Sequence, residues 1–177
     1  KPDLIFVSAV EDVIVQASEL LSCIEDMKIP HLVGGVFPTA AADVCLNFSS
    51  INAVARGEGE RIIIEYAERV RTGLPINDIP GVWYKTPDSK IIKNPNPPLI
   101  NINNLIPDFS LFEESRFYRP MGGKVFKTVP IETYRGCPYA CTFCNSPMQR
   151  DFSKAEGQGN FMRRKTIDNL RAELKSI

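Results

Sequence analysis

Apolar residues in the first part of the chain alternate between short runs and helical stripes. The run at residues 4–10 is rich in β-forming side chains, which is typical of a strand buried on both faces. Residues 11–28 then carry apolar side chains at helical spacing, and Pro30 ends that segment. Because the alternation continues, it predicts a parallel α/β layer. The further segments are apolar runs at 31–33 and 52–55 and helical patterns at 38–48 and 62–70.

Proline becomes frequent after Gly73, which stands where a helix C-terminal glycine belongs. Nine prolines lie within residues 75–130. In this stretch the β-forming runs at 81–85 and 90–93 flank a Thr-Pro-Asp-Ser turn, so they predict a β-hairpin. Residues 94–121 show no long periodicity, and we expect an extended connector that has no packed core of its own.

Regular patterns return in the last part of the chain. Strand character reappears at 129–134, and residues 166–177 carry an apolar stripe at helical spacing. Thr166 is placed to cap this helix, with Asn169 three residues further on. The sequence therefore predicts three parts, which are an α/β domain at 1–74, a hairpin and proline-rich connector at 75–128, and the start of a second α/β domain at 129–177.

Composition and charge remove several classes of function. The 177 residues include 21 basic and 21 acidic side chains, and 44% are hydrophobic, which is typical of a globular protein. Balanced charge argues against a protein that binds duplex nucleic acid by neutralising phosphates. No apolar run approaches the roughly 20 residues that a membrane span requires. We therefore expect neither a nucleic-acid partner nor a membrane span.

Three of the five cysteines stand within eight residues of one another. An odd and clustered count does not fit the disulfide framework of a secreted protein, so we expect a reducing, cytoplasmic setting. The clustered cysteines are Cys137, Cys141 and Cys144. Cys23 and Cys45 lie in predicted helices, and we interpret them as semi-buried thiols outside the cluster.

Spacings of four and three residues can turn the sulfur atoms of this cysteine loop toward one point. Thiolates select soft metals, namely zinc, copper(I) and iron–sulfur clusters. Structural zinc usually takes four protein ligands, and no fourth cysteine or histidine lies in the 33 residues that follow Cys144. Three ligands therefore favour a centre with one open position, such as an iron–sulfur cluster. A structural zinc in a non-catalytic α/β binding module stays open as the alternative.

The loop resembles the signature of the radical S-adenosylmethionine (radical SAM) family. The resemblance rests on the cysteine spacing, on Phe143 before the last cysteine, and on the flanking Arg135-Gly136 and Pro138-Tyr139. It implies that Cys137, Cys141 and Cys144 hold a [4Fe–4S] cluster, whose fourth iron binds S-adenosylmethionine. It further implies that Phe143 lies near the adenine, and that an external electron donor reduces the cluster so that a 5′-deoxyadenosyl radical forms.

The N-terminal part resembles the cobalamin-binding (B12-binding) domain that precedes many radical SAM barrels. The matching segments are Ser8-Ala9-Val10, Gly34-Gly35 and residues 57–60. The resemblance implies a flavodoxin-like Rossmann fold in which Ser8, Gly34 and Gly35 line the pocket for the cofactor's nucleotide tail. Glycine also lets backbone approach a ligand closely at the carboxyl ends of parallel strands. The alternative interpretation of Gly34-Gly35 is purely structural, as a tight turn between a strand and a helix.

Two departures from the family pattern limit what we expect of the chain. The Asp-x-His-x-x-Gly motif, whose histidine can ligate cobalt, is absent, and we interpret His31 as a structural residue. The first two strands of the cobalamin-binding fold are missing, and only one βα unit of a radical SAM partial TIM barrel follows Cys144. We therefore expect an inactive fragment of an enzyme that methylates, rearranges or cyclises a small-molecule or metabolite substrate.

Overall fold

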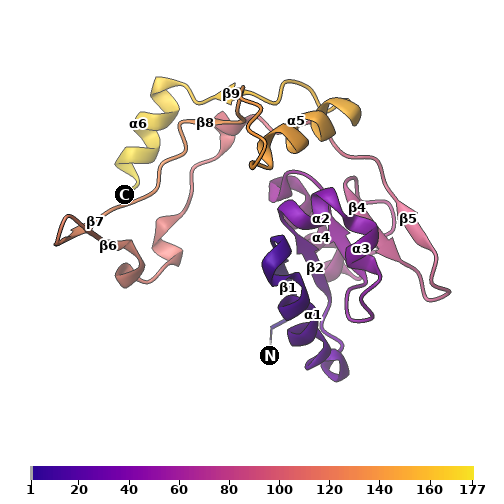
Figure 1. The fold of residues 1–177 in the computed structure, drawn as a ribbon. Helices are drawn as coiled ribbons and strands as arrows, with labels where there is room; N and C mark the ends of the chain where they lie inside the picture. Colours follow the sequence, from indigo (N-terminus) through magenta and orange to yellow (C-terminus); the bar gives the residue numbers. More distant parts are fainter. Residues whose placement is uncertain (1) are drawn as a thin grey trace. The chain divides into compact units, whose positions relative to one another are not determined.

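The predicted strand–helix alternation forms a five-stranded sheet in the computed structural model, which describes residues 2–177 (Figure 1). The first three strands are parallel, and the last two are an antiparallel hairpin that continues the same sheet through β3 and β4. The strands are β1 (Ile5–Ser8), β2 (His31–Gly34), β3 (Ala53–Ala55), β4 (Val82–Lys85) and β5 (Ile91–Lys93). The predictions of an α/β fold and of the hairpin are confirmed.

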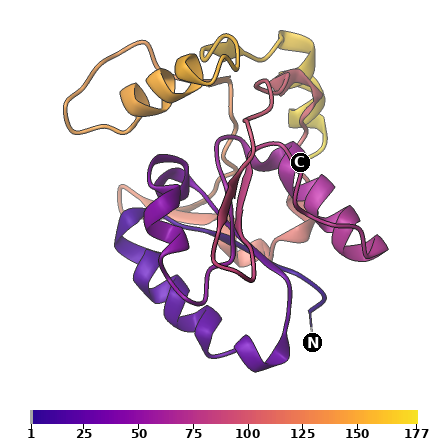
Figure 2. The ribbon, with the colours of Figure 1, turned by 90° about the vertical axis from the view of Figure 1, so that its right-hand side faces the viewer.

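Helices cover both faces of this sheet. The helices are α1 (Ile14–Ser22), α2 (Val36–Ala40), α3 (Ala42–Leu46) and α4 (Gly59–Thr72), with 3-10 turns η1 (Glu11–Val13) and η2 (Glu25–Met27). Val33 and Val54 pack toward α1 and α3, whereas Leu32 and Ala53 pack toward α4. Strand side chains alternate between faces, so the unit has three layers, with α4 (magenta in Figure 2) and α1 (indigo) on opposite sides of the sheet.

One helix of the prediction is wrong in its bounds. The helix expected at 38–48 is two short helices, α2 and α3, and the first begins at Val36. The break falls at Ala41, whose φ of −134° and ψ of 48° are not helical. By contrast, α4 ends where expected, because Gly73 adopts the left-handed conformation (φ 69°) that caps a helix without steric cost.

A helix that the sequence did not lead us to expect follows the cysteine loop. Helix α5 (Ser146–Ala155) carries few apolar residues, so its periodicity is weak. One of its residues, Ser153, is buried. After the helix, the side-chain amide of Gln158 donates to the Pro97 carbonyl and fixes this part of the chain. The residues up to Ile100 and Pro138–Phe161 form the first of two compact units.

The second unit consists of Asn101–Cys137 and Met162–Ile177. The connector expected to be extended contains a hairpin of two exposed strands, which turns at Gly122-Gly123. The strand expected at 129–134 is confined to a two-residue pairing with the segment before the last helix. The elements are η3 (Ile102–Asn104), η4 (Phe109–Leu111), η5 (Glu114–Phe117), β6 (Tyr118–Met121), β7 (Lys124–Lys127), β8 (Tyr134–Arg135), β9 (Arg163–Arg164) and α6 (Ile167–Lys175).

Helix α6 is held by its cap and by a buried ion pair. The Thr166 side chain accepts a hydrogen bond from the Asn169 amide, as the sequence predicts. Lys165 Nζ lies 2.5 Å from Glu173 Oε2 with both side chains at most 1% exposed, and it also donates to the Leu105 carbonyl at 3.3 Å. Within residues 2–177, no helix combines the length and the apolar content needed to cross a membrane.

Candidate functional site

A cavity of about 300 Å³ opens at the carboxyl ends of the parallel strands. The predicted residues Ser8, Gly34 and Gly35 all line it, and Ser8 pairs with Gly34 across β1 and β2. The carboxyl ends of parallel strands are where ligands bind in open α/β sheets. The structure therefore brings together the three positions that the sequence selects, at the edge of the sheet where a bound group is expected.

Gly35 shapes this cavity because no other residue fits its position. Its φ of 107° and ψ of −170° belong to a region essentially restricted to glycine. A Cβ atom on Gly35 would lie 2.6 Å from the Ala9 carbonyl oxygen and 3.1 Å from Ser8 Oγ. The turn that follows β2 is thus packed directly against the end of β1. Gly35 therefore both forms a tight turn and lines the cavity.

The loop after β3 completes the cavity. Gly57 and Gly59 line it, and the Gly57 amide donates to Thr39 Oγ1 at 3.0 Å. The apolar wall, which comes from Phe6, Leu32 and Ile63, was missed by the sequence reasoning. Two of these three are strand residues, and alternation along the strands was the signal that could have placed them. The cavity therefore has glycine-rich backbone on one side and apolar side chains on the other.

The second half of the cysteine motif forms a tight turn at the start of α5. The Cys144 amide donates to the Cys141 carbonyl at 3.2 Å, and the Ser146 amide donates to Cys144 Sγ at 3.4 Å. Both thiols are free and exposed, and Phe143 between them is 92% exposed. A hydrogen bond to a ligand atom orients it, so the Ser146 amide helps to fix the direction in which Cys144 Sγ points.

Cys137 belongs to the second unit, whereas Cys141 and Cys144 belong to the first. Cys137 is half-buried and free. Two residues before it, the Arg135 guanidinium forms a bidentate pair with Glu132, with nitrogen–oxygen distances of 2.8 and 2.9 Å. Among residues 2–177, no three cysteine, histidine, aspartate or glutamate side chains are grouped closely enough to hold a metal ion. The chemistry of the donor set, three unbridged thiols, fits an iron–sulfur cluster.

The two remaining cysteines lie outside this motif. Cys45 is fully buried in α3, and burial raises the pKa of its thiol to about 11, which keeps it protonated and inert. Cys23 is exposed at the end of α1, so our interpretation of it as semi-buried is wrong. It is the residue that caps α1, directly after Ser22.

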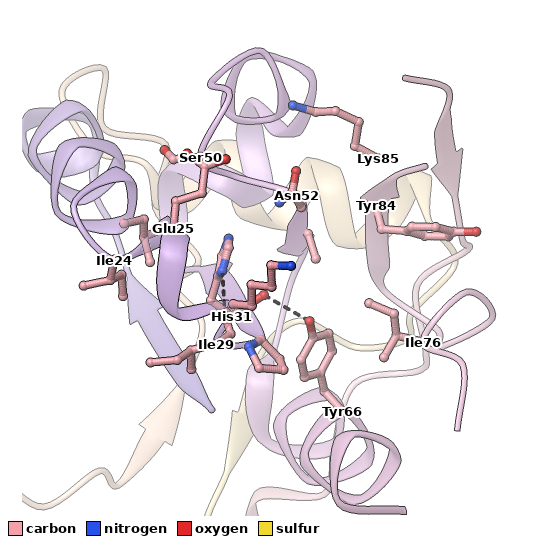
Figure 3. A pocket seen from close by; sticks show the side chains of 14 residues that line it. Ile24, Glu25, Ile29, His31, Ser50, Asn52, Tyr66, Ile76, Tyr84 and Lys85 are labelled. Atoms are coloured by element: carbon pink, nitrogen blue, oxygen red, sulfur yellow. Dashed lines mark hydrogen bonds between the residues drawn. The ribbon is translucent and has the colours of Figure 1, made fainter. Parts of the chain in front are cut away.

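A second cavity, of about 500 Å³, lies at the opposite ends of the same strands (Figure 3). His31 and Asn52 line it at the starts of β2 and β3. Figure 3 shows the Tyr66 hydroxyl pointing to the His31 carbonyl, to which it donates at 3.0 Å. His31 Nδ1 lies 3.3 Å from the Ile29 carbonyl oxygen. The Tyr66 bond is to the backbone carbonyl of position 31, which any residue would offer, and His31 Nε2 is buried without a hydrogen-bond partner among the described residues.

Comparison with known proteins finds a sequence relative and shared folds. No protein-family profile matches the chain. The chain is 30% identical over 154 residues to the anaerobic magnesium-protoporphyrin IX monomethyl ester cyclase of Rubrivivax gelatinosus, in a match that covers 82% of this chain and 27% of that protein. The chain therefore spans about a quarter of the length of this relative.

Two solved structures share the fold over 99% of the chain. One is the cobalamin-dependent S-adenosylmethionine radical enzyme OxsB, with a TM-score of 0.68, 22% identity and 23% of its chain covered. The other is the radical S-adenosylmethionine methyltransferase TsrM from Kitasatospora setae, with a TM-score of 0.62, 18% identity and 34% covered. The two structures show the fold of the chain, and together with the sequence relative and the cysteine motif they support its identification as part of a B12-binding radical SAM protein.

Proposed function

We propose that this chain forms the junction between the cobalamin-binding part and the cluster-binding part of a radical SAM enzyme. The observation that carries the proposal is the order of features along the chain. A Rossmann-type sheet with a glycine-lined cavity precedes a loop whose three cysteines match the radical SAM spacing. The solved structure of OxsB was obtained with aqua-cobalamin and S-adenosylmethionine bound, and that of TsrM with cobalamin and a [4Fe–4S] cluster.

In this proposal Cys137, Cys141 and Cys144 bind the cluster through their thiolates, and the missing fourth protein ligand leaves one iron for S-adenosylmethionine. The Ser146 amide, 3.4 Å from Cys144 Sγ, stabilises the negative charge on that ligand. The exposed ring of Phe143 is free to lie against the adenine. Cluster and cobalamin, when bound, supply reductive cleavage of S-adenosylmethionine to a 5′-deoxyadenosyl radical and transfer of a methyl group.

Ser8, Gly34 and Gly35 hold the nucleotide tail of cobalamin in the cavity at the strand ends. The two glycines present bare backbone, which lets a ligand come close, and the Ser8 hydroxyl can donate or accept a hydrogen bond. The apolar wall excludes water from the tail. On the far side of the cavity, Gly57 and Gly59 also present bare backbone, which a ligand can approach closely.

The reaction we propose for the whole enzyme is methylation, rearrangement or cyclisation of a small-molecule substrate, with an external electron donor. The relatives support this range, because one is a cyclase and one solved structure is a methyltransferase. The substrate-binding residues of a barrel would project from its strands. This chain has only the two-residue pairing of β8 and β9 in that part.

The cluster proposal is tested by anaerobic reconstitution of the chain with iron and sulfide, followed by Mössbauer and EPR spectroscopy. We expect a [4Fe–4S] signal that Cys137→Ala abolishes, because two thiolates cannot hold the cluster. Cys23→Ala is the matched control, since this exposed thiol lies outside the motif and its loss leaves the signal unchanged. Stoichiometric zinc in protein purified without added iron, with no cluster after reconstitution, would instead establish the non-catalytic zinc-binding module.

A further inference from the structure

Arg56 is clamped between two aromatic rings that come from distant parts of the first unit. Its guanidinium carbon lies 4.1 Å from the centroid of the Trp83 ring and 4.8 Å from that of Phe152. Arg56 Nη1 also lies 3.3 Å from Glu156 Oε1, and the Arg56 side chain is only 13% exposed. A planar guanidinium stacks on aromatic faces in a way that a lysine ammonium cannot. The contact therefore depends on arginine and not on charge alone.

Phe152 and Glu156 place this clamp on helix α5 and at its end. The helix begins directly after the cysteine motif, and its first amide, that of Ser146, donates to Cys144 Sγ. The Arg150 guanidinium on the same helix donates to the Pro138 carbonyl at 3.4 Å, inside the cysteine loop. A helix moves as a rigid element, so a displacement of α5 displaces the turn that carries Cys141 and Cys144.

The backbone next to Arg56 forms the wall of the cavity. Ala55 and Gly57, on either side of it, both line the cavity at the strand ends. A Cβ atom on Gly57 would lie 3.7 Å from Phe152 Cε1, so the cavity wall packs against α5 as well. The Arg56 amide donates to the Gly81 carbonyl at 2.9 Å, which fixes its backbone to the start of β4. One short segment thus contacts the cavity, the sheet and α5.

We propose that Arg56 is a positioning residue for the cysteine motif. It fixes α5, and with it Cys141 and Cys144, against the end of the sheet that carries the glycine-lined cavity. The position of these two cluster ligands is then set by the cobalamin-binding part of the molecule. This inference rests on the proposed function for its role in the enzyme, whereas the contacts that fix α5 exist without any bound group.

Hydrogen exchange of backbone amides measures the positioning directly. In Arg56→Gln the stacked cation is lost, and we expect the amides of α5 and of Ser146 to exchange about tenfold faster. The amides of β1–β3 should keep their rates. Arg56→Lys keeps the charge but not the planar stack and should lie between wild type and Arg56→Gln. Arg69→Gln is the matched control, because Arg69 on α4 pairs with Glu65 of the same helix and with Asp78 in the loop after it.

A second readout comes from the reconstituted cluster. We expect the EPR signal of Arg56→Gln to be broader than that of wild type, because Cys141 and Cys144 then sample more positions. Unchanged exchange in α5, or exchange that rises equally throughout β1–β3, would overturn the proposal, as would a cluster signal identical to wild type. If wild-type protein forms no cluster, the proposed function fails, and the exchange pattern alone decides whether Arg56 positions the turn.

Discussion

Gly35 shows how one residue sets both the fold and the cavity. Its backbone lies in a glycine-only region, and a Cβ atom there would meet the Ala9 backbone at 2.6 Å. We predict that Gly35→Ala destabilises the protein by about 3 kcal/mol, as the sum of backbone strain and a clash that β1 cannot relieve. The measurement is the free energy of unfolding in urea.

Gly73→Ala is the matched control for Gly35→Ala. Gly73 also has a positive φ (69°, with ψ 20°), but it lies in the left-handed helical region that other residues can enter, and a Cβ atom there would have no neighbour within 4 Å. The control gives the cost of left-handed backbone without a clash, about 1 kcal/mol, and the remaining loss in Gly35→Ala comes from its glycine-only backbone region and from the contact with Ala9. Equal losses in the two variants would show that the contact with Ala9 contributes nothing.

Tyr66 gives the folded protein a pH dependence in the alkaline range. Burial raises the pKa of its phenol from 10 to about 12, and the hydroxyl donates to the His31 carbonyl at 3.0 Å. The unfolded chain releases this proton near pH 10, whereas the folded chain keeps it until about pH 12. Below pH 10 the stabilisation is therefore complete, and it is lost as the pH rises from 10 to 12.

The test of this prediction compares wild type with Tyr66→Phe in urea unfolding across that pH range. Wild-type stability should fall more steeply above pH 10 than that of the variant, which has no phenol at this position to titrate. Parallel pH profiles for the two proteins would contradict the assignment to Tyr66. Cys45, whose thiol pKa is raised to about 11, contributes equally to both proteins and cancels in the comparison.

At the scale of elements, helix α6 depends on its cap. The Thr166 hydroxyl accepts from the Asn169 amide at 3.2 Å, which satisfies one of the free amides at the helix start. We predict that Thr166→Ala weakens α6 by about 1 kcal/mol, seen as faster amide exchange within α6. Thr72→Ala, which removes a hydroxyl that donates to the Glu68 carbonyl on α4, should leave exchange in α6 unchanged.

The elements that the sequence predicted are those whose signal is local. Helix α4 has an apolar stripe and Gly73, and α6 has a stripe and Thr166, so period and cap agree. Helix α5 escaped prediction because its anchor, Phe152, lies against Arg56, which is distant in sequence. The hairpin at Gly122-Gly123 was missed although a Gly-Gly turn is a hairpin signal, because its exposed strands lack the alternation that marks a buried face.

At the scale of the whole molecule, the candidate sites were predictable to different extents. Ser8, Gly34 and Gly35 could be placed together because strand ends meet at one edge of a parallel sheet. The cysteine spacing identified the ligands, but the boundary between the two units falls between Cys137 and Pro138. Local spacing carries no information on that division. The cation–π clamp on Arg56 joins residues almost a hundred positions apart, and only the folded chain brings them together.

Substitutions in the two cavities of the sheet should have different effects on the affinity for cobalamin. Gly34 lines the cavity at the carboxyl ends of the strands, and a Cβ atom there would meet only Ala55, at 3.5 Å from its Cβ and 3.9 Å from its carbonyl oxygen, which is ordinary contact. We predict that Gly34→Val narrows this cavity and weakens cobalamin binding at least about tenfold, with little change in thermal unfolding. Titration followed by the cobalamin absorbance spectrum measures the affinity.

Asn52→Leu is the comparison that shows which of the two cavities binds cobalamin. Asn52 is an exposed residue that lines the cavity in Figure 3, at the amino end of β3, so its replacement alters that cavity and leaves the strand carboxyl ends intact. Cobalamin affinity should stay at the wild-type value in Asn52→Leu. If this variant weakens binding and Gly34→Val does not, the ligand binds at the starts of the strands, and the assignment of Ser8, Gly34 and Gly35 fails. If both variants keep the wild-type affinity, cobalamin binds in neither cavity.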